Sequence, residues 1–280
     1  YFNIGNRSQA IKKAIDNAEP NEIILIAGKG HENYQDYGNR VISISDKQIV
    51  KNLKVGKSKK NKKKINYLFN SKILNKIIKK NKFYKFKDFI TDSREVKKNS
   101  LFLAIKGKKN DGNNFIAKAI KKGASVIISS KVNKKYKNKI VKVNNEIDFL
   151  NKFASLKRKK SNASIVAITG SAGKTSLKNM LKDLLDVFGS TYASPRSFNN
   201  HLGVPISISN LSVEDNYGVF ELGMSKKGEI KDLSKLIQPH IGIITNVGEA
   251  HIENFKNING IAKAKAEIIE NIKENGTIIL

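Results

Sequence analysis

Hydrophobic and polar residues follow two periods along the chain, one typical of strands and one typical of helices. Short apolar runs predict strands at residues 21–27, 41–44, 101–105, 125–129, 165–168, 217–222, 241–245 and 277–280. Apolar residues at helical spacing predict helices at 7–18, 66–80, 116–122, 258–272 and from residue 174 onward. This alternation predicts an α/β fold whose largest part is a doubly wound, mostly parallel sheet.

One strand and the helix after it are joined by a glycine turn that carries lysine and threonine. Gly-Ser-Ala-Gly at 170–173 follows the strand, and Lys174 and Thr175 open the helix. Glycines let backbone N–H groups converge on an anion, and the helix N-terminus adds partial positive charge. This layout is typical of a P-loop, in which the lysine reaches the β- and γ-phosphates and the hydroxyl ligates Mg²⁺.

The loop departs from the general nucleotide-binding pattern in one respect. Fewer residues separate Gly170 from Gly173 than the pattern G-x-x-x-x-G-K-[ST] requires. An ordinary turn with a chance Gly-Lys-Thr is therefore the alternative. In either case the following helix should face a core through Leu177, Met180, Leu181, Leu184 and Leu185.

Polar residues stand at the carboxyl ends of two later strands. Glu221 ends one of them, and Asn246 and His251 follow the next. Because α/β sheets bind ligands at this edge, these residues should meet Lys174. Carboxylate and hydroxyl oxygens suit Mg²⁺, so Glu221 and Thr175 are candidate metal ligands. The alternatives are a solvated acid at Glu221 and an ordinary loop histidine at His251.

Length and composition bound the possible classes of protein. The chain has 280 residues, 39% of them hydrophobic, which is enough for about two domains with real cores. It has no cysteine, which excludes disulfides and thiolate chemistry. No apolar run approaches the length of a membrane span and no signal peptide is visible, so we expect a cytoplasmic protein. The chain begins with Tyr1 rather than Met, so we expect the true N-terminus to lie upstream.

The formal net charge of +29 raises nucleic-acid binding as an alternative function. Only five of the 53 basic residues are arginine, however, and nucleic-acid readers usually rely on arginine forks. Lys, Asn and Ile are all abundant and all have A/T-rich codons, which indicates a mutational bias that placed lysine on solvated faces. We therefore expect no nucleic-acid partner.

Several motifs occur here in the order found in the Mur ligase family of peptidoglycan-precursor ligases. They are TGSAGKT, SFNNHLGVP, ELGMSKKGEI, TNVGEAHIENF and AKAKAEI. With them, residues 65–280 resemble the MurF-type branch of the family. The resemblance implies ATP binding by Thr169, Gly170, Ser171, Ala172, Gly173, Lys174, Thr175, Ser176 and Asn246.

The same resemblance implies roles at the reaction centre. Glu221 and His251, with Thr175, would hold Mg²⁺, and Lys174, His251 and Lys265 would be catalytic. The family uses a lysine after the histidine motif, carbamylated in several members, to bridge metals. Lys265 is the best match and Lys263 the second, and a solvated helix lysine is the alternative.

Two further sets of residues are candidates for binding the substrate. The resemblance implies that Asn199 and Asn200 lie beside the substrate and phosphate. Upstream, TDSR, LFLAIKG, DG and GA resemble the N-terminal UDP-binding domain shared by MurE- and MurF-type ligases. Ser93 and Arg94 would lie near the uridine diphosphate, where an arginine can fork onto the diphosphate. A surface ion pair is the alternative for Arg94.

The first residues resemble the C-terminal tail of MurE-type ligases through AIKKAIDNAEPNEIILIAGKGHENYQ. In members that add diaminopimelate, the positions of Gly28 and Glu32 contact that amino acid. Lysine-rich residues between this tail and the next domain predict a solvated linker, with a nucleic-acid tail as the alternative. The expected domains are therefore 1–53, the linker 54–64, 65–155 and 156–280, which would form part of a MurE–MurF fusion.

Together these resemblances imply an ATP- and Mg²⁺-dependent ligase that joins D-Ala-D-Ala to UDP-MurNAc-tripeptide, acting as a monomer without membrane insertion. In the family a C-terminal domain closes over ATP, and we expect no such domain within residues 1–280. We therefore expect these residues alone to bind nucleotide without turnover. Folylpolyglutamate synthase, which shares the ATP loop, and a lysine-rich nucleic-acid binder are the alternative functions.

Overall fold

The computed structural model of the chain describes residues 4, 6–17, 26, 34–36, 41–42, 45–46, 49, 59–107, 110–250 and 252–280. The chain divides into two compact units, Tyr1–Lys59 and Lys60–Leu280. None of the helices in the described part is long and apolar enough to cross a membrane.

The first unit has a helix and a short antiparallel strand pair, namely α1 (Arg7–Asn17), β1 (Gln35–Asp36) and β2 (Val41–Ile42). The guanidinium of Arg7 donates two hydrogen bonds to the carboxylate of Asp46, at 2.7 and 2.6 Å. Ile11 and Ile49 are buried. The predicted helix at the start of the chain is confirmed, whereas the predicted strand at 21–27 lies, apart from residue 26, outside the described residues.

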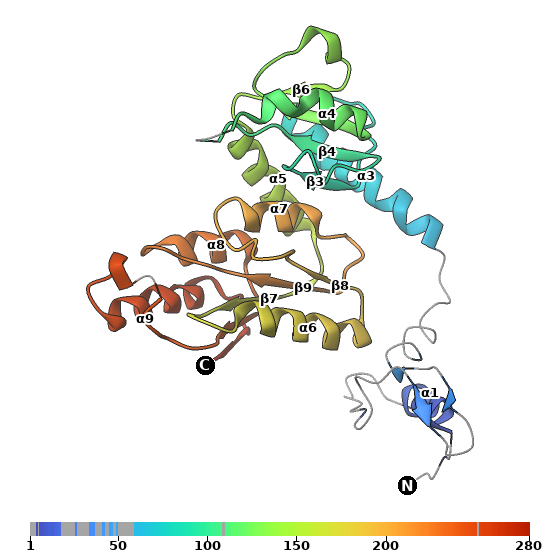
Figure 1. Ribbon diagram of the computed structural model, residues 1–280, viewed down its shortest axis with the longest axis vertical. Helices are drawn as coiled ribbons and strands as arrows, with labels where there is room; N and C mark the ends of the chain where they lie inside the picture. Colours follow the sequence, from blue (N-terminus) through green and yellow to red (C-terminus); the bar gives the residue numbers. More distant parts are fainter. Residues whose placement is uncertain are drawn as a thin grey trace. The chain divides into compact units, whose positions relative to one another are not determined.

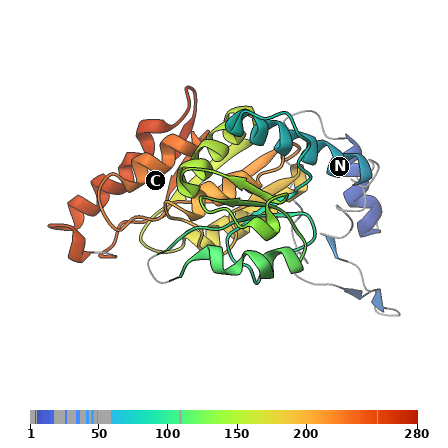
Figure 2. The ribbon, with the colours of Figure 1, turned by 90° about the horizontal axis from the view of Figure 1, so that it is seen from above.

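The second unit begins with a lobe built on a four-stranded parallel sheet of order β3-β4-β5-β6. The strands are β3 (Asp88–Ile90), β4 (Ser100–Leu103), β5 (Ala124–Ser129) and β6 (Ile140–Lys142). The helices are α3 (Lys59–Ile78), α4 (Ile116–Lys121) and α5 (Glu146–Lys160), with 3₁₀ turns η1 (Gly112–Phe115) and η2 (Lys134–Tyr136). Figure 2 shows α4 on one side of this sheet and α3 and α5 on the other. We call residues 60–160 the amino lobe.

Helix α3 begins at Lys59 and therefore extends into the segment predicted as a solvated linker. Lysine is a good helix former, so a lysine run can continue a helix that is anchored by packing further along. That anchor is the buried pair Ile73 and Leu74, which packs under the first sheet with Phe89 and Phe153.

The carboxyl lobe, residues 161–280, is built on a five-stranded parallel sheet of order β11-β10-β7-β9-β8. Its strands are β7 (Ser164–Thr169), β8 (Thr191–Ala193), β9 (Tyr217–Glu221), β10 (Ile241–Ile244) and β11 (Thr277–Ile279). Its helices are α6 (Lys174–Phe188), α7 (Gly203–Asn210), α8 (Glu229–Ile237) and α9 (Ile258–Ala266), with 3₁₀ turns η3 (Ile252–Asn254) and η4 (Glu267–Asn271). Figure 1 shows α6 on one face of the sheet and α7 and α8 on the other. The predicted α/β fold with parallel sheets is confirmed.

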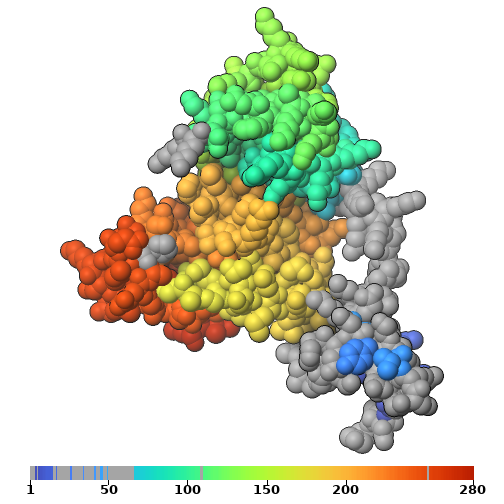
Figure 3. Space-filling model, in the orientation of Figure 1, coloured from blue at the N-terminus to red at the C-terminus, as the bar shows by residue number. Residues whose placement is uncertain are grey.

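The apolar face of α6 is narrower than the sequence predicted. Leu177, Leu181 and Leu185 pack against the sheet, but Met180 is 69% exposed and Leu184 is 57% exposed. Helix α6 lies at the surface of the unit (Figure 3, yellow). Only a narrow stripe of side chains, spaced four residues apart along the helix, therefore reaches the sheet. The prediction that Met180 and Leu184 face a core is therefore wrong.

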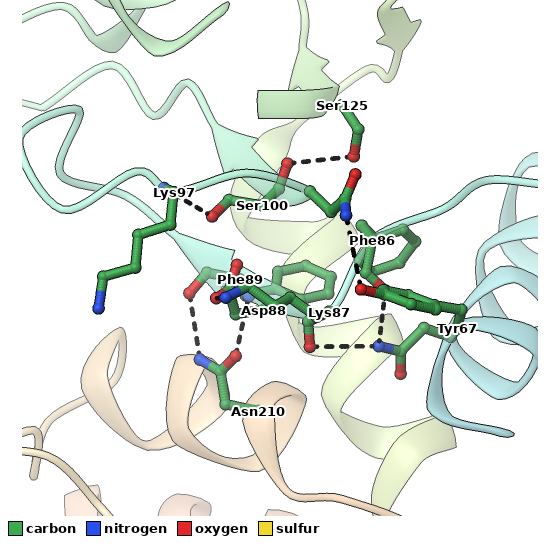
Figure 4. Close-up of polar contacts among 11 residues, drawn as sticks. Tyr67, Phe86, Lys87, Asp88, Phe89, Lys97, Ser100, Ser125 and Asn210 are labelled. Carbon is green, nitrogen blue, oxygen red and sulfur yellow. Dashed lines mark hydrogen bonds and ion pairs between the residues drawn. The ribbon is translucent and has the colours of Figure 1, made fainter. Parts of the chain in front are cut away.

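The two lobes are joined by packing and by a paired amide. Helix α5, which spans the predicted domain border at residues 155 and 156, packs against α7. At the edge strand β3, the Asn210 side chain accepts a hydrogen bond from the Phe89 backbone N–H at 2.8 Å and donates to its carbonyl at 3.1 Å (Figure 4). Asn210 thus pairs with β3 as a neighbouring strand would and fixes the carboxyl lobe to that edge.

Candidate functional site: two adjoining cavities

The loop between β7 and α6 is shaped by two glycines with positive φ. Gly170 has φ +147°, and a Cβ atom there would lie 1.9 Å from the hydroxyl oxygen of Thr245. Gly173 has φ +80° and directly precedes the first turn of α6. Because side chains at these positions would strain the backbone, the turn requires glycine. It brings the N-terminus of α6, with its partial positive charge, to the carboxyl edge of the sheet.

Thr245 and Asn246, which follow β10, hold this loop in place through hydrogen bonds to its backbone. The side-chain oxygen of Asn246 accepts hydrogen bonds from the backbone N–H groups of Ser171 and Ala172, at 3.0 and 2.9 Å. The Thr245 hydroxyl donates to the Ala172 carbonyl at 2.5 Å. The structure therefore brings Asn246 to the predicted place, where it holds the loop. Thr169 is buried and its hydroxyl has no hydrogen-bond partner among the described residues.

Glu221 lies at the end of β9, directly beside the start of α6. Its carboxylate accepts a hydrogen bond from the Thr175 hydroxyl at 2.8 Å and another from the Asn199 amide at 2.8 Å. The side chain is 2% exposed. The structure thus brings together Thr175, Asn199 and Glu221, three residues that are far apart in the sequence. A solvated strand-end acid, the alternative for Glu221, is wrong.

Sequence reasoning missed Lys178, which completes this cluster. Its Nζ lies 3.8 Å from the Glu221 carboxylate, and its side chain is 2% exposed. It also donates a hydrogen bond to the Arg196 carbonyl. Burial lowers the pKa of Lys178, and the Glu221 charge opposes that shift. The available signal was spacing, because Lys178 follows Lys174 by one helical turn and therefore lies on the same side of α6.

A cavity of about 420 Å³ opens over the loop. Gly170, Ser171, Lys174, Asn199, Asn200, His201 and Lys265 are among the residues that line it. The Lys174 Nζ donates to the Gly170 carbonyl at 2.7 Å, so the side chain folds back over the loop. Lys265 on α9 is 2% exposed, and burial, together with the charge of nearby Lys174, lowers its pKa to about 8. A solvated lysine, the alternative for Lys265, is wrong.

The segment before α7 lies between this cavity and a second one. The Asn200 side chain accepts hydrogen bonds from the backbone N–H groups of Leu202 and Gly203, at 3.1 and 2.9 Å, and so satisfies two donors where α7 begins. Asn200 also lines both cavities. The two cavities therefore adjoin at this residue.

The second cavity, of about 890 Å³, lies between the two lobes. Thr91, Asp92, Ser93, Arg94, Phe115, Lys118, Ser197 and Phe198 are among its lining residues. Ser93 is buried, while the Arg94 side chain is 79% exposed and is paired with Asp92 at 2.7 Å. Hydrogen bonding to Arg94 lowers the pKa of Asp92 to about 2. The ion-pair interpretation of Arg94 therefore holds in this structure, and the guanidinium also borders the cavity.

The chemistry of the donor set at Glu221 fits Mg²⁺. The Thr175 and Glu221 oxygens are 2.8 Å apart, close to the roughly 2.9 Å between adjacent ligands of an octahedron with ~2.05 Å bonds. In the part of the chain that the structure describes, no group of three or more His, Cys, Asp or Glu side chains gathers as a metal site. His251, Gly28 and Glu32 lie outside the described residues. Ser176 lies in the first turn of α6 and is exposed.

Comparison with known families places this fold and site in one class. Residues 89–158 match the catalytic domain of the Mur ligase family, and residues 168–280 match the Mur ligase middle domain. The chain therefore carries Mur ligase family domains, and these matches cover the residues that form both cavities.

Individual relatives point to the MurF branch. The chain is 44% identical over 190 residues to the UDP-N-acetylmuramoyl-tripeptide–D-alanyl-D-alanine ligase of Rickettsia prowazekii, covering 68% of this chain and 42% of that protein. It is 34% identical over 190 residues to the ligase of the same name from Escherichia coli, with the same coverage. The chain thus spans less than half the length of these relatives.

Solved structures agree with the sequence relatives. Crystal structure I of MurF from Acinetobacter baumannii has a TM-score of 0.65 at 32% identity and covers 74% of this chain and 47% of that chain. MurF from Thermotoga maritima, solved in complex with ADP, has a TM-score of 0.60 at 34% identity and covers 71% of this chain and 46% of that chain. The second unit is therefore homologous to part of MurF.

Proposed function

We propose that the second unit is the UDP-sugar- and ATP-binding part of a ligase that joins D-Ala-D-Ala to UDP-MurNAc-tripeptide. ATP would phosphorylate the peptide carboxylate, and the amine of D-Ala-D-Ala would attack the acyl phosphate to form the amide and release phosphate. One observation carries the proposal: Asn200 lines both cavities, so the two cavities adjoin. A substrate held by its diphosphate in one cavity can extend its peptide end into the other.

The residues of the loop would bind and orient the nucleotide. The N-terminus of α6 and the Lys174 ammonium would neutralise the phosphates, which is the main demand of phosphoryl transfer. Thr175 and Glu221 would hold Mg²⁺, with His251 as a further ligand. When bound, the metal supplies charge stabilisation at the transferred phosphate. Asn199 would keep the Glu221 carboxylate turned toward that place.

Lys265 would act as a carbamate rather than as an amine. Its low exposure and its pKa, lowered to about 8, give it a larger neutral fraction near neutral pH than an ordinary lysine has, and only a neutral amine can react with CO₂. The product is a carboxylate, which can ligate a cation where an ammonium cannot. Mass spectrometry of the native protein at high bicarbonate should show an addition on Lys265 and none on Lys263, which is the alternative carrier.

The nucleotide assignment is tested by Lys174→Ala. We expect Mg·ATP binding by the 280-residue chain to fall by about two orders of magnitude, and ATP turnover by the full-length natural protein to disappear. Lys182→Ala, on the same helix but paired with Asp186 at the surface, is the matched control and should bind normally. Near-normal binding by Lys174→Ala would refute the assignment.

Substrate binding separates the remaining alternatives. Calorimetric titration with UDP-MurNAc-tripeptide should show binding, whereas a folylpolyglutamate synthase would show none. A nucleic-acid binder would show DNA or RNA affinity that falls steeply with salt. We expect no such affinity at physiological salt, and we retain a cytoplasmic, monomeric protein as part of the proposal.

A MurE-type origin of residues 1–53 is a further part of the proposal, in which Gly28 and Glu32 would derive from the amino-acid site of that ligase. It rests on the sequence resemblance alone. Intact-mass measurement of the natural protein tests it, because a fusion requires one polypeptide that carries both ligases. Two separate polypeptides would exclude the fusion.

A further inference from the structure

The segment before α7 is held at Arg196 by two charged groups that the proposed reaction does not use, one on the backbone carbonyl and one on the guanidinium. The buried Lys178 ammonium donates to the Arg196 carbonyl and lies 3.8 Å from the Glu221 carboxylate. The Arg196 guanidinium in turn pairs with Glu95 of the amino lobe at 2.6 Å, in an exposed ion pair whose side chains are 75% and 39% exposed. Arg196 therefore links the acid of the nucleotide cavity to the loop that carries Ser93 and Arg94.

The backbone conformation of Arg196 indicates that contacts from neighbouring groups hold this residue in place. Arg196 has φ +48°, a left-handed conformation that costs a non-glycine residue free energy. The buried ammonium compensates by binding the Arg196 carbonyl. Ser197 and Phe198 follow at once and line the second cavity, and Asn199 follows them and binds Glu221. One short segment thus touches both ligand sites.

We propose that Lys178 is a positioning residue that couples the two cavities. This inference rests on the proposed function for the identity of the ligands. Lys178 fixes residues 195–200 against Glu221, so a ligand that orders this segment in one cavity prepares it for the other. Coupling of this kind is reciprocal, because each ligand must change the affinity of the other by the same factor. Lys178 touches no reacting atom, so its effect is on binding and order.

The test measures coupling with two probes, UDP and Mg·ADP, on the 280-residue chain. We expect saturating Mg·ADP to strengthen UDP binding about tenfold in the unaltered protein. Lys178→Met should reduce this factor to about one. Lys182→Met, one turn further along α6 and paired with Asp186 at the surface, should leave the tenfold factor intact. A factor that Lys178→Met leaves unchanged, or a factor of one in the unaltered protein, would overturn the proposal.

Amide hydrogen exchange gives a readout that does not depend on UDP binding. Without ligand, Lys178→Met should raise exchange about tenfold in residues 195–200 and in residues 92–96, and leave β5 unchanged. If the unaltered chain fails to bind UDP, the proposed function is at fault, and exchange still decides the role of Lys178. Unchanged exchange would overturn that role.

Two further variants keep the proposal testable if Lys178→Met does not fold. Lys178→Gln retains a donor for the Arg196 carbonyl and should preserve part of the coupling. Arg196→Ala keeps the carbonyl and removes the exposed ion pair with Glu95, so it should reduce the coupling factor while Mg·ADP binding stays normal. Full coupling in Arg196→Ala would contradict the link through Glu95.

Discussion

The two cavities of the second unit are built in opposite ways. Beside the loop between β7 and α6 the charged groups are buried and paired, since Glu221 and Lys178 are each 2% exposed and lie 3.8 Å apart. Around Ser93 the charges lie at the surface, where Arg94 is 79% exposed and its partner Asp92 is 33% exposed. Buried networks hold one geometry, whereas exposed ion pairs exchange partners readily. We therefore expect the first cavity to be organised before its ligand binds, and the second cavity to adjust as its ligand binds.

The strongest test of the preorganised cavity is Gly170→Ala. The added Cβ would lie 1.9 Å from the Thr245 hydroxyl in a backbone conformation of φ +147°. We expect a loss of about 4 kcal/mol in the free energy of unfolding and about a hundredfold loss of Mg·ATP affinity. Urea unfolding and calorimetric titration measure the two effects.

Gly228→Ala is the matched control for that variant. Gly228 also has positive φ, +92°, but no atom lies within 4 Å of the place that an added Cβ would take. It should therefore cost only about 1 kcal/mol of backbone strain and leave nucleotide binding unchanged. Equal losses in the two variants would show that backbone strain, and not the contact with Thr245, governs the loop.

Neutralising the buried Glu221 beside the first cavity and the exposed Asp92 in the second compares the two surroundings directly. Glu221→Gln leaves the Lys178 ammonium buried without its counter-charge, which should cost about 3 kcal/mol of stability and remove the Mg²⁺ dependence of nucleotide binding. Asp92→Asn, at the surface, should change stability by less than about 0.5 kcal/mol. Thermal and urea unfolding of both variants measure the contrast, and similar costs would mean that the burial of Glu221 carries little energy.

For a second buried lysine, Lys157, the charge of Asp215 opposes the effect of burial on the pKa but does not outweigh it. Lys157 in the amino lobe is 2% exposed, and its Nζ donates to the Asn70 side-chain oxygen at 2.6 Å. Burial lowers its pKa to about 7, well below that of the unfolded chain. Between pH 7 and the unfolded pKa of about 10.4, the unfolded chain holds a proton that the folded chain has released, so stability should rise with pH.

The expected rise is about 2 kcal/mol between pH 7 and pH 9, measured by urea unfolding. Other groups titrate in this range, so the informative quantity is the difference from Lys157→Met, which lacks this proton. The stability of the unaltered protein relative to that of Lys157→Met should rise over this range, because the folded lysine becomes neutral while the unfolded lysine still holds its proton. Parallel pH profiles for the two proteins would mean that Lys157 stays charged in its folded site.

The parts of the site that the sequence predicted are those set by local backbone rules. Two glycines between an apolar run and a Lys-Thr pair specify the turn, and parallel strands bring Glu221 to the same edge. The strands β3, β6 and β8 were not predicted, because each has only three residues and too little periodicity.

The parts that were missed depend on which face of an element is covered. Met180 and Lys178 lie on the same helix, and the sequence pattern favours burial of the methionine. In the fold Met180 is exposed and Lys178 is buried, because Glu221 and the Arg196 carbonyl stand where Lys178 points. Such partners come from distant segments, so no local pattern of α6 reveals them.

The smallest expected effect is a change in UDP affinity at the second, exposed cavity. The sign of that change shows how Asp92 acts on Arg94. The Arg94 guanidinium is bound by both oxygens of Asp92, at 3.0 and 2.7 Å. If a diphosphate binds there, Arg94 must exchange one anion for another.

Asp92→Asn removes the competing charge and should strengthen UDP binding about threefold, whereas Arg94→Lys, which loses the planar fork, should weaken it. Calorimetric titration at low and physiological salt measures both, and the gain should shrink at higher salt because the groups are exposed. A loss of affinity in Asp92→Asn would mean that the carboxylate orients Arg94 for the ligand, and the second cavity would then be preorganised like the first.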